Sequence, residues 1–411
     1  MKKLFIILAV VILLSALVIS GCAQPAPAPA PAPTPTPAPA PAAQPKTLKV
    51  GTVYSLSGSG SAQALAWRDA ALLAKDWVNQ KGGITVNGEK YLLDLVVEDS
   101  TATPPGVINA CTKLIELDKV KFITGEAVTV FVEAASQIAN KNNVLYVAQG
   151  NSHIYPDYPY TFVSSFIWIS VIPHLYDITL EKYPAVKTIG YIVEDEAGAR
   201  VIGEISQNAA KSHGLTVLEP VFHPWGSNEF YPQWTKIMTQ NPDAVALGLV
   251  LPQLGANCVK QGRELGYKGP IFCITPIGSP TMLGMIGEEY ATDFISPSYD
   301  PYGPEAPPMA KEVVKFWHET YDYKIGAYDY FDAFDTVYCL SQAIEKAQSL
   351  DPTDVRDSWQ KMATLETVKG TAKMGGAKTY GINNVVFSPL PLGRFQDGKI
   401  EFLKWVDPWV P

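Results

Sequence analysis

Residues 48–83, LKVGTVYSLSGSGSAQALAWRDAALLAKDWVNQKGG, decide the fold class of this 411-residue chain. The β-rich run at 48–56 predicts a strand, and the amphipathic run at 63–83 predicts a helix that ends at Gly82 and Gly83. A strand followed by a longer helix is the first half of a strand–helix–strand unit. Such units build parallel sheets that are covered by helices.

The same alternation of short and long runs continues along the chain in two series. The first series has further strands at 91–100, 120–127 and 144–150, separated by helices at 107–120 and 130–143. The second series has strands at 188–195, 215–222, 244–250 and 271–275, separated by helices at 201–214, 230–240 and 255–266. The two series predict an α/β fold with two similar, doubly wound lobes.

The N-terminus predicts export. Two lysines precede an apolar run at residues 5–19, which is shorter than the roughly 20 residues of a membrane span and is typical of a secretory signal. Ile19-Ser20-Gly21-Cys22 resembles a bacterial lipobox. Residues 1–21 are therefore predicted to be a lipoprotein signal peptide and Cys22 the acylated first residue of the mature protein. An ordinary signal with a chance cysteine is the alternative.

Residues 22–46 consist almost entirely of Pro and Ala after the cysteine and predict an extended tether of about 3.1 Å per residue. The tether would hold a globular body away from the outer face of the cytoplasmic membrane, in the periplasm, or at an outer membrane if the cell is Gram-negative. A Pro-rich recognition ligand is the alternative.

Charge and motif patterns exclude several classes of function. The formal net charge is −8 and the chain has no basic run, so nucleic acid is not an expected partner. The histidines lack metal-ligand spacing, and GSGS at 58–61 is neither a nucleophile elbow nor a phosphate loop, so we expect no enzyme, metal or cofactor. Ser152 and His153 are adjacent, and adjacent side chains point apart, which argues against a nucleophile and base.

Four cysteines remain after Cys22, and they are too far apart for a CxxC motif: Cys111, Cys258, Cys273 and Cys339. An exported protein could join two of them in a disulfide. Cys111 and Cys339 lie in apolar helical patterns, where buried free thiols are common. The pattern leaves both outcomes open.

From residue 47 to about 405, the chain resembles the leucine/isoleucine/valine-type substrate-binding proteins of ABC importers, which have the type I periplasmic-binding-protein fold. The resemblance is carried, in order, by residues 50–84, 96–100 (VVEDS), 122–129 (FITGEAVT), 241–248 (NPDAVALG), 262–272 and 330–352. It implies a three-stranded hinge with crossovers near 166, 295 and 380. The N-terminal lobe would be 47–166 plus 296–380, and the C-terminal lobe 167–295 plus 381–411. It also implies a monomer that closes over its ligand and delivers it to ABC permease subunits.

By the same resemblance, a ligand carboxylate is held at Thr129, Gly150, Asn151 and Ser152. These residues follow predicted strands, and ligands of open α/β sheets bind beyond the carboxyl ends of the strands. Neutral donors suffice, because a hydrogen bond to a charged group contributes about 1.5–3 kcal/mol. Thr129 and Ser152 could instead be helix N-caps, and both roles are compatible because a helix N-terminus is itself an anion site. Further hydrogen bonds are expected from three residues that would face the cleft: Ser57, Ser61 and Gln63.

The residues with which this family usually binds a ligand's ammonium group are missing. Ala197 stands where the family often has a tyrosine, and Leu251 and Pro276, beside Ile277, stand where amino-acid binders place a tyrosine and an acidic group. A buried ammonium without a partner costs several kcal/mol, which disfavours an α-amino acid.

Two glutamates could still receive an amine, Glu196 and Glu126, although loop carboxylates are usually solvated. Phe166 and Trp168 at the first crossover suggest an apolar or aromatic ligand body. We therefore expect an extracytoplasmic solute-binding protein for a small organic acid such as a benzoate- or phenylacetate-like compound. The alternatives are a binder of an amino acid or amide with a non-standard amine site, and a tethered ligand sensor.

Overall fold

The computed structural model describes residues 44–58, 60–151, 154, 156–224, 226–248, 252–275, 277, 280–322 and 330–408. The predictions for the signal peptide, for Cys22 and for the tether as far as residue 43 lie outside these residues. In the part of the chain that is described, no helix is long and apolar enough to cross a membrane. Residues Gln44–Pro411 form one compact unit that contains two sheets.

The first sheet has the strand order β13-β14-β15-β6-β5-β4-β1-β3-β2. Its strands are β1 (Lys46–Tyr54), β2 (Ile84–Val86), β3 (Glu89–Asp99), β4 (Phe122–Gly125), β5 (Leu145–Asn151), β6 (Thr161–Ile167), β13 (Thr364–Thr367), β14 (Gly370–Gly375) and β15 (Val385–Phe387). From β3 through β1, β4, β5 and β6 to β15 the strands are parallel. Their carboxyl ends therefore meet at one edge of the sheet.

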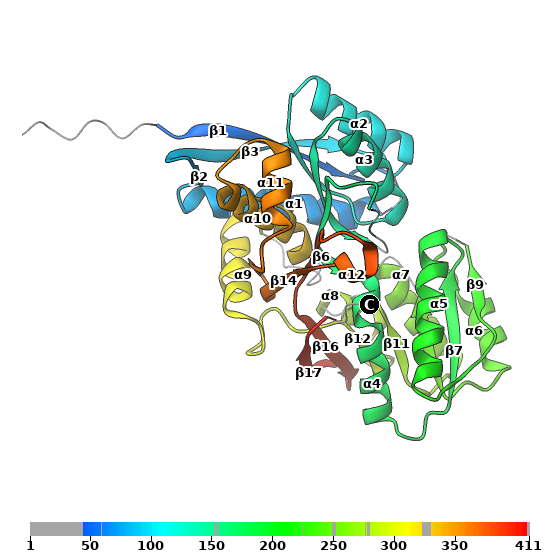
Figure 1. Cartoon of the computed structure of the whole chain (residues 1–411). Helices are drawn as coiled ribbons and strands as arrows, with labels where there is room; N and C mark the ends of the chain where they lie inside the picture. The colour runs from blue at the N-terminus through cyan, green and yellow to red at the C-terminus, as the bar shows by residue number, and fades with distance from the viewer. Residues whose placement is uncertain are drawn as a thin grey trace, which may run out of the picture. The chain divides into compact units, whose positions relative to one another are not determined.

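Helices cover both faces of the first sheet (Figure 1). On one face lie α1 (Ser61–Gln80), α9 (Pro308–Thr320), α10 (Tyr330–Ala347) and α11 (Pro352–Trp359), which share one apolar core with the sheet. On the other face α2 (Pro104–Glu116) and α3 (Thr129–Lys141) pack side by side. The short α12 (Ala377–Tyr380) precedes β15. This is the doubly wound arrangement that the first sequence series predicts.

The second sheet has the order β17-β16-β12-β11-β10-β7-β8, with β9 also paired to β7. Its strands are β7 (Thr188–Glu194), β8 (Thr216–Val217), β9 (Val221–His223), β10 (Ala244–Gly248), β11 (Ile271–Cys273), β12 (Phe294–Ser296), β16 (Leu390–Gln396) and β17 (Lys399–Val406). One face carries α4 (Ile172–Lys182), preceded by the 3₁₀ helix η1 (Trp168–Val171), and α5 (Ala197–Ser212). The other carries α6 (Tyr231–Met238), α7 (Pro252–Glu264) and α8 (Pro280–Ile286).

One detail of the second series differs from the sequence prediction. The single strand expected at 215–222 is two short strands, β8 and β9, which pair in turn with the same neighbour, β7. Pro220 lies between them, and a proline lacks the N–H group that a continuous ladder would need.

The chain passes between the two sheets three times: after β6, after β12, and between β15 and β16. The first two passages fall where crossovers were expected, near 166 and 295. The third falls between Phe387 and Leu390, later than the expected position near 380, because β15 still pairs with β14 and β6 of the first sheet. By sheet membership, β15 (Val385–Phe387) belongs to the first sheet.

Cys111, Cys258, Cys273 and Cys339 are all buried and free. Burial raises the pKa of the Cys111 thiol to about 12, so it stays protonated and inert at neutral pH. The buried thiols of Cys111 and Cys339 agree with the apolar helical patterns in which they lie.

Candidate functional site

A cavity of about 270 Å³ opens where the parallel strands of the first sheet end. Its lining residues come from the loops after β1, β3 and β4, from the N-terminal halves of α1 and α3 with their N-caps, and from the N-cap of α5: Ser55, Gly60, Ala64, Trp67, Ala102, Glu126, Val128, Val130, Phe131 and Glu196. Ser55 and Glu126 directly follow β1 and β4, and Glu196 lies at the start of α5 beyond β7. The cavity thus occupies the position at which open α/β sheets bind ligands.

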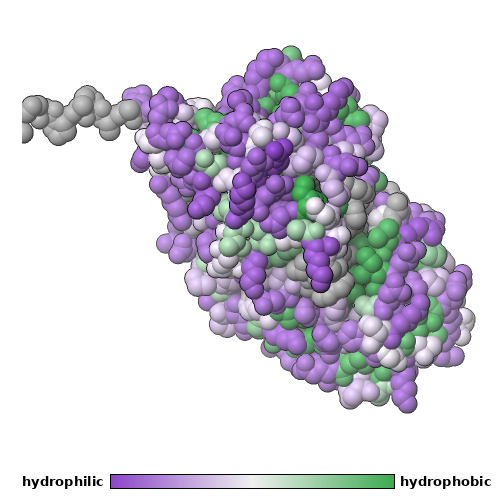
Figure 2. Space-filling view, in the orientation of Figure 1, coloured by the Kyte–Doolittle hydropathy of each residue, from purple (hydrophilic) through white to green (hydrophobic). Residues whose placement is uncertain are grey.

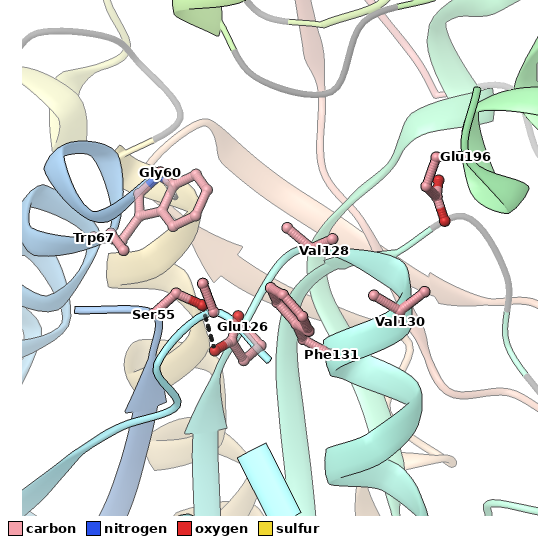
Figure 3. Close-up of a pocket in the computed structure, with 10 residues that line it drawn as sticks. Ser55, Gly60, Trp67, Glu126, Val128, Val130, Phe131 and Glu196 are labelled. Carbon is pink, nitrogen blue, oxygen red and sulfur yellow. Dashed lines mark hydrogen bonds between the residues drawn. The ribbon is translucent and has the colours of Figure 1, made fainter. Parts of the chain in front are cut away.

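Most of the cavity wall is apolar. Trp67 on α1 and Phe131 on α3 are large aromatic residues, each less than 10% exposed, and Val128 and Val130 flank the start of α3. Figure 3 shows the Glu126 carboxyl between Ser55 and Phe131, with Trp67 and Glu196 on opposite sides of the cavity. Apolar walls with a few polar groups are typical of small-molecule sites.

Glu126 is 1% exposed, so the expectation of a solvated loop carboxylate was wrong for this residue. Its Oε1 accepts hydrogen bonds from Ser55 Oγ at 3.2 Å and from Ser100 Oγ at 2.6 Å, and these two hydroxyls are 2.9 Å apart. Burial raises the pKa of Glu126 to about 7, and the bonds from Ser100 and Ser55 oppose that rise.

The backbone before Glu126 explains why its side chain points inward. Gly125 has φ of 121°, and a Cβ added there would lie 2.0 Å from the carbonyl oxygen of Val53. Only glycine fits such a close approach. Glu126 itself has φ of 50°, which is uncommon for a residue other than glycine, and its N–H donates to the Val53 carbonyl at 3.0 Å. The turn after β4 therefore holds the carboxyl at the ends of β1 and β4.

Glu196 is the N-cap of α5. Its Oε2 accepts a hydrogen bond from the Ala199 N–H at 3.0 Å, and its Oε1 is buried with no hydrogen-bond partner in the part of the chain that is described. Glu194, at the end of β7, is fully buried and accepts from the Gly226 N–H at 3.1 Å. Burial raises the pKa of Glu194 to about 7, but this carboxyl does not line the cavity.

The residues predicted to hold a carboxylate lie around the same strand ends. Thr129 is the first residue of α3, and the N-cap position is occupied by Val128. Val128 and Val130, on either side of Thr129, both line the cavity. Gly150 and Asn151 end β5, which pairs with β4. Ser152 lies outside the described residues.

The other predicted site residues are spread more widely. Ser57 is exposed and its N–H donates to Asp99 at 3.2 Å, whereas Ser61 is the first residue of α1, next to the lining residue Gly60. Gln63 is 2% exposed, and its Oε1 accepts a hydrogen bond of 2.6 Å from Gln253 of α7. This bond joins a helix of the first lobe to a helix of the second.

The remaining predicted residues belong to the crossover and the second lobe. Phe166 pairs in the sheet with Gly150, Trp168 begins η1, and Ala197 is the first residue of α5. Ile277 is fully buried in the apolar core of the second lobe. Leu251 and Pro276 lie outside the described residues. Of all the predicted site residues, Glu196 alone is among the described lining residues of this cavity.

Several lining residues were not predicted, although the sequence carries a signal for each of them. Trp67 lies four residues after Gln63 in a predicted helix, a spacing that places both on one helix face. Phe131 lies in the first turn after Thr129, and Ser55 ends the first predicted strand. Thr129 was predicted because ligands bind beyond the carboxyl ends of parallel strands, and the same reasoning applies to these positions.

A second groove of about 450 Å³ lies between α4 and α5 and is lined by Ile172, Pro173, Ile205, Asn208, Ala209, Ser212 and His213. Figure 2 shows hydrophobic surface beside α5. Helix side chains line this groove, and no strand end contributes to it, so the strand-end cavity is the stronger candidate for a ligand site. Within the described residues, no group of three or more His, Cys, Asp or Glu could hold a metal ion.

Comparison with known proteins agrees with this architecture. The sequence model of the periplasmic binding protein family matches residues 47–399. The Leu/Ile/Val-binding protein homolog 8 of Brucella melitensis is 24% identical over 375 residues, which cover 86% of this chain and 89% of that protein.

Two solved structures illustrate the range of bound ligands. The branched-chain amino acid transporter substrate-binding protein LivJ of Streptococcus pneumoniae, in complex with isoleucine, is similar with a TM-score of 0.73 and 19% identity, covering 88% of this chain and all of that one. A solute-binding protein of an ABC transporter from Rhodopseudomonas palustris, in complex with 3,4-dihydroxybenzoic acid, is similar with a TM-score of 0.75 and 19% identity. The match covers 89% of this chain and 98% of that one.

The fold and the cavity at the strand ends define a two-lobed solute-binding protein of the type I class. The chain belongs to the periplasmic binding protein family. Membership implies a small ligand, a location outside the cytoplasm and ABC permease subunits as partners.

Proposed function

We propose that this protein captures a small organic acid with an apolar or aromatic body and delivers it to the permease of an ABC importer. The exported chain would be held at the membrane by acylated Cys22 and the tether, act as a monomer, and return its ligand chemically unchanged. The observation that carries the proposal is the apolar cavity between Trp67 and Phe131 at the start of α3.

The start of α3 suits the charged end of such a ligand. The first N–H groups of a helix lack intrahelical partners, and the helix dipole places partial positive charge there. Thr129 adds a hydroxyl at this position, and Gly150 ends a neighbouring strand. A carboxylate at this point would leave the ligand body against the aromatic side chains.

The size of the cavity favours a compact ligand. Pockets for drug-sized molecules measure roughly 300–1,000 Å³, and this cavity of about 270 Å³ lies just below that range. A single aromatic ring with one acidic group is of suitable size. The two lobes would close over such a ligand through contacts that both make with it.

A matched ligand panel tests the proposal. We would measure thermal shifts and calorimetric binding with benzoate, phenylacetate, benzamide, benzylamine and leucine. Benzoate or phenylacetate should bind, and benzamide, which keeps the ring and loses the charge, should bind at least tenfold more weakly. Tight binding of leucine with no response to the aromatic acids would contradict the proposal.

A second candidate ligand carries an amine, and a specific observation favours it. Glu126 and Glu196 both line the cavity, and none of the lining residues that the structure describes is Lys or Arg. A buried carboxylate gains from a cationic partner, so an amino acid or amide-type ligand could use these glutamates. Binding of benzylamine or leucine that is lost in Glu196→Gln would favour this candidate.

A further inference from the structure

We propose that Glu126 selects the charge of the ligand by taking up a proton from solvent when an organic anion binds, and that its protonated carboxyl then donates a hydrogen bond to the ligand carboxylate. This inference rests on the proposed function and assigns to one residue the discrimination between acids and amines.

The position of Glu126 places its carboxyl close to any anion at the start of α3. Glu126 lies two residues before Val128 and three before Thr129, on the same loop between β4 and α3. Gly125 and the hydrogen bond from the Glu126 N–H to Val53 fix that loop. The side chain therefore has little freedom to turn away from a ligand.

The carboxyl of Glu126 lines the cavity, so its protonated form can present an O–H group to a ligand. Oε1 accepts from both Ser55 and Ser100, and the Ala127 backbone N–H also donates to this carboxyl. A carboxylate oxygen of the ligand cannot donate a hydrogen bond. It can, however, accept one from a protonated Oε2, which converts a repulsive contact into an attractive one.

Among the described residues, no cationic side chain faces Glu126. The titratable groups around it are Asp99 at the end of β3, Tyr54 on β1, Tyr146 on β5, Cys111 on α2, and Glu196 across the cavity. Burial raises the pKa of both tyrosines and of the thiol, so these three groups stay neutral.

With no cation facing it, a proton is the available counter-charge for Glu126. Burial already raises the pKa of Glu126 to about 7 in the free protein. A bound anion would raise it further, because a neighbouring like charge disfavours ionisation. Binding of an acid at pH 8 would therefore be accompanied by proton uptake at this carboxyl. An amine would instead favour the ionised form of Glu126, so its binding near pH 7, where about half of this carboxyl is protonated, would release up to about half a proton.

Calorimetry measures the direction of proton exchange directly. Benzoate would be titrated into the full-length protein at pH 8 in phosphate and in Tris, two buffers with different ionisation enthalpies, and the difference in observed enthalpy gives the number of protons exchanged. We expect uptake approaching one proton per ligand. The dissociation constant should rise by up to about tenfold per pH unit above pH 7 and be independent of pH below pH 6.

Two variants locate the proton. Glu126→Gln keeps an oxygen for Ser55 and Ser100, and it should bind benzoate without proton exchange and with an affinity independent of pH. Glu194→Gln is the matched control, because Glu194 is also buried and has a pKa of about 7 but does not line the cavity. Proton uptake should persist in this control.

The possible failures are distinguishable. Binding of benzoate to the wild-type protein without proton uptake, or uptake that persists in Glu126→Gln, would overturn this inference and leave the proposed function intact. Absence of binding by both benzoate and phenylacetate, or binding of benzylamine with proton release, would overturn both. If Glu126→Gln does not fold, absence of proton uptake by the wild-type protein still overturns the inference, and Ser100→Ala, which removes a hydrogen bond that favours the ionised carboxyl, should raise the pH above which affinity falls.

Discussion

Replacing Glu126 by Gln should make the ligand-free protein more stable at neutral and alkaline pH and leave its stability unchanged in acid. The pKa of Glu126 is raised from 4.5 to about 7 by burial. Between these two values the native state binds more protons than the unfolded state, so stability falls as pH rises. Below pH 4.5 both states are protonated, and above pH 7 the cost of the buried charge is fully present.

The magnitude follows from the two pKa values. A difference of one unit between the pKa values of a group in the folded and unfolded states corresponds to about 1.4 kcal/mol. The buried carboxylate of Glu126 therefore costs roughly 3 kcal/mol at pH 8. Gln carries no charge and keeps an acceptor for Ser55 and Ser100. The difference in the free energy of unfolding between Glu126→Gln and wild type should therefore grow from near zero at pH 4 to about 3 kcal/mol at pH 8.

Urea denaturation of both proteins at a series of pH values, followed by tryptophan fluorescence, measures this difference. Other titrating groups cancel in the comparison. Ser100→Ala is a useful companion, because it removes the 2.6 Å hydrogen bond that favours the ionised carboxyl. It should enlarge the pH dependence in the wild-type background and not in the Glu126→Gln background. A stability difference that is constant from pH 4 to pH 8 would refute the reasoning.

Three further predictions concern ligand binding. Trp67→Ala should weaken binding of an aromatic acid by about tenfold to a hundredfold, since it removes one aromatic wall, whereas Trp67→Phe should retain most of the affinity in calorimetry. Thr129→Ala combined with Ser152→Ala should weaken binding at least tenfold with an unchanged circular dichroism spectrum, because each hydrogen bond to a carboxylate contributes about 1.5–3 kcal/mol; an unchanged dissociation constant would contradict the site assignment. Gln253→Ala removes the donor to Gln63, and small-angle scattering should then detect a larger open population, with binding weakened about twofold to tenfold. Identical scattering of the variant and the wild type would argue against a role in closure.

The fold of the first lobe could be predicted well from the sequence, because its strands and helices are local patterns. The expected helix at 130–143 is α3, and the expected strand at 144–150 is β5, each within two residues at either end. The pattern also indicated which loops lie at the carboxyl edge of the sheet. The start of α3 borders the cavity for that reason.

Contacts between distant parts of the chain could not be predicted in the same way. The third crossover was expected near 380, but β15 joins the first sheet through Val163, more than 200 residues earlier in the chain. The strand expected at 215–222 has the right composition and yet is divided at Pro220. Strand pairing depends on partners that a local pattern does not contain.

The burial of Glu126 also depends on contacts that the local sequence does not contain. In the sequence it is a charged residue after a strand, and such residues are usually solvated. Its burial depends on the positive φ of Gly125 and of Glu126 itself and on the nearby carbonyl of Val53. The glycine before the glutamate was visible in the sequence, but the backbone that it packs against belongs to β1.

A crystal structure of the protein with bound benzoate would show directly whether the strand-end cavity holds an organic acid by its carboxylate. We expect a carboxylate oxygen within about 2.7–3.2 Å of Thr129 Oγ1 or of a backbone N–H near Gly150, with the ring between Trp67 and Phe131. A ligand amine bonded to Glu126 and Glu196, or a ligand outside this cavity, would contradict it.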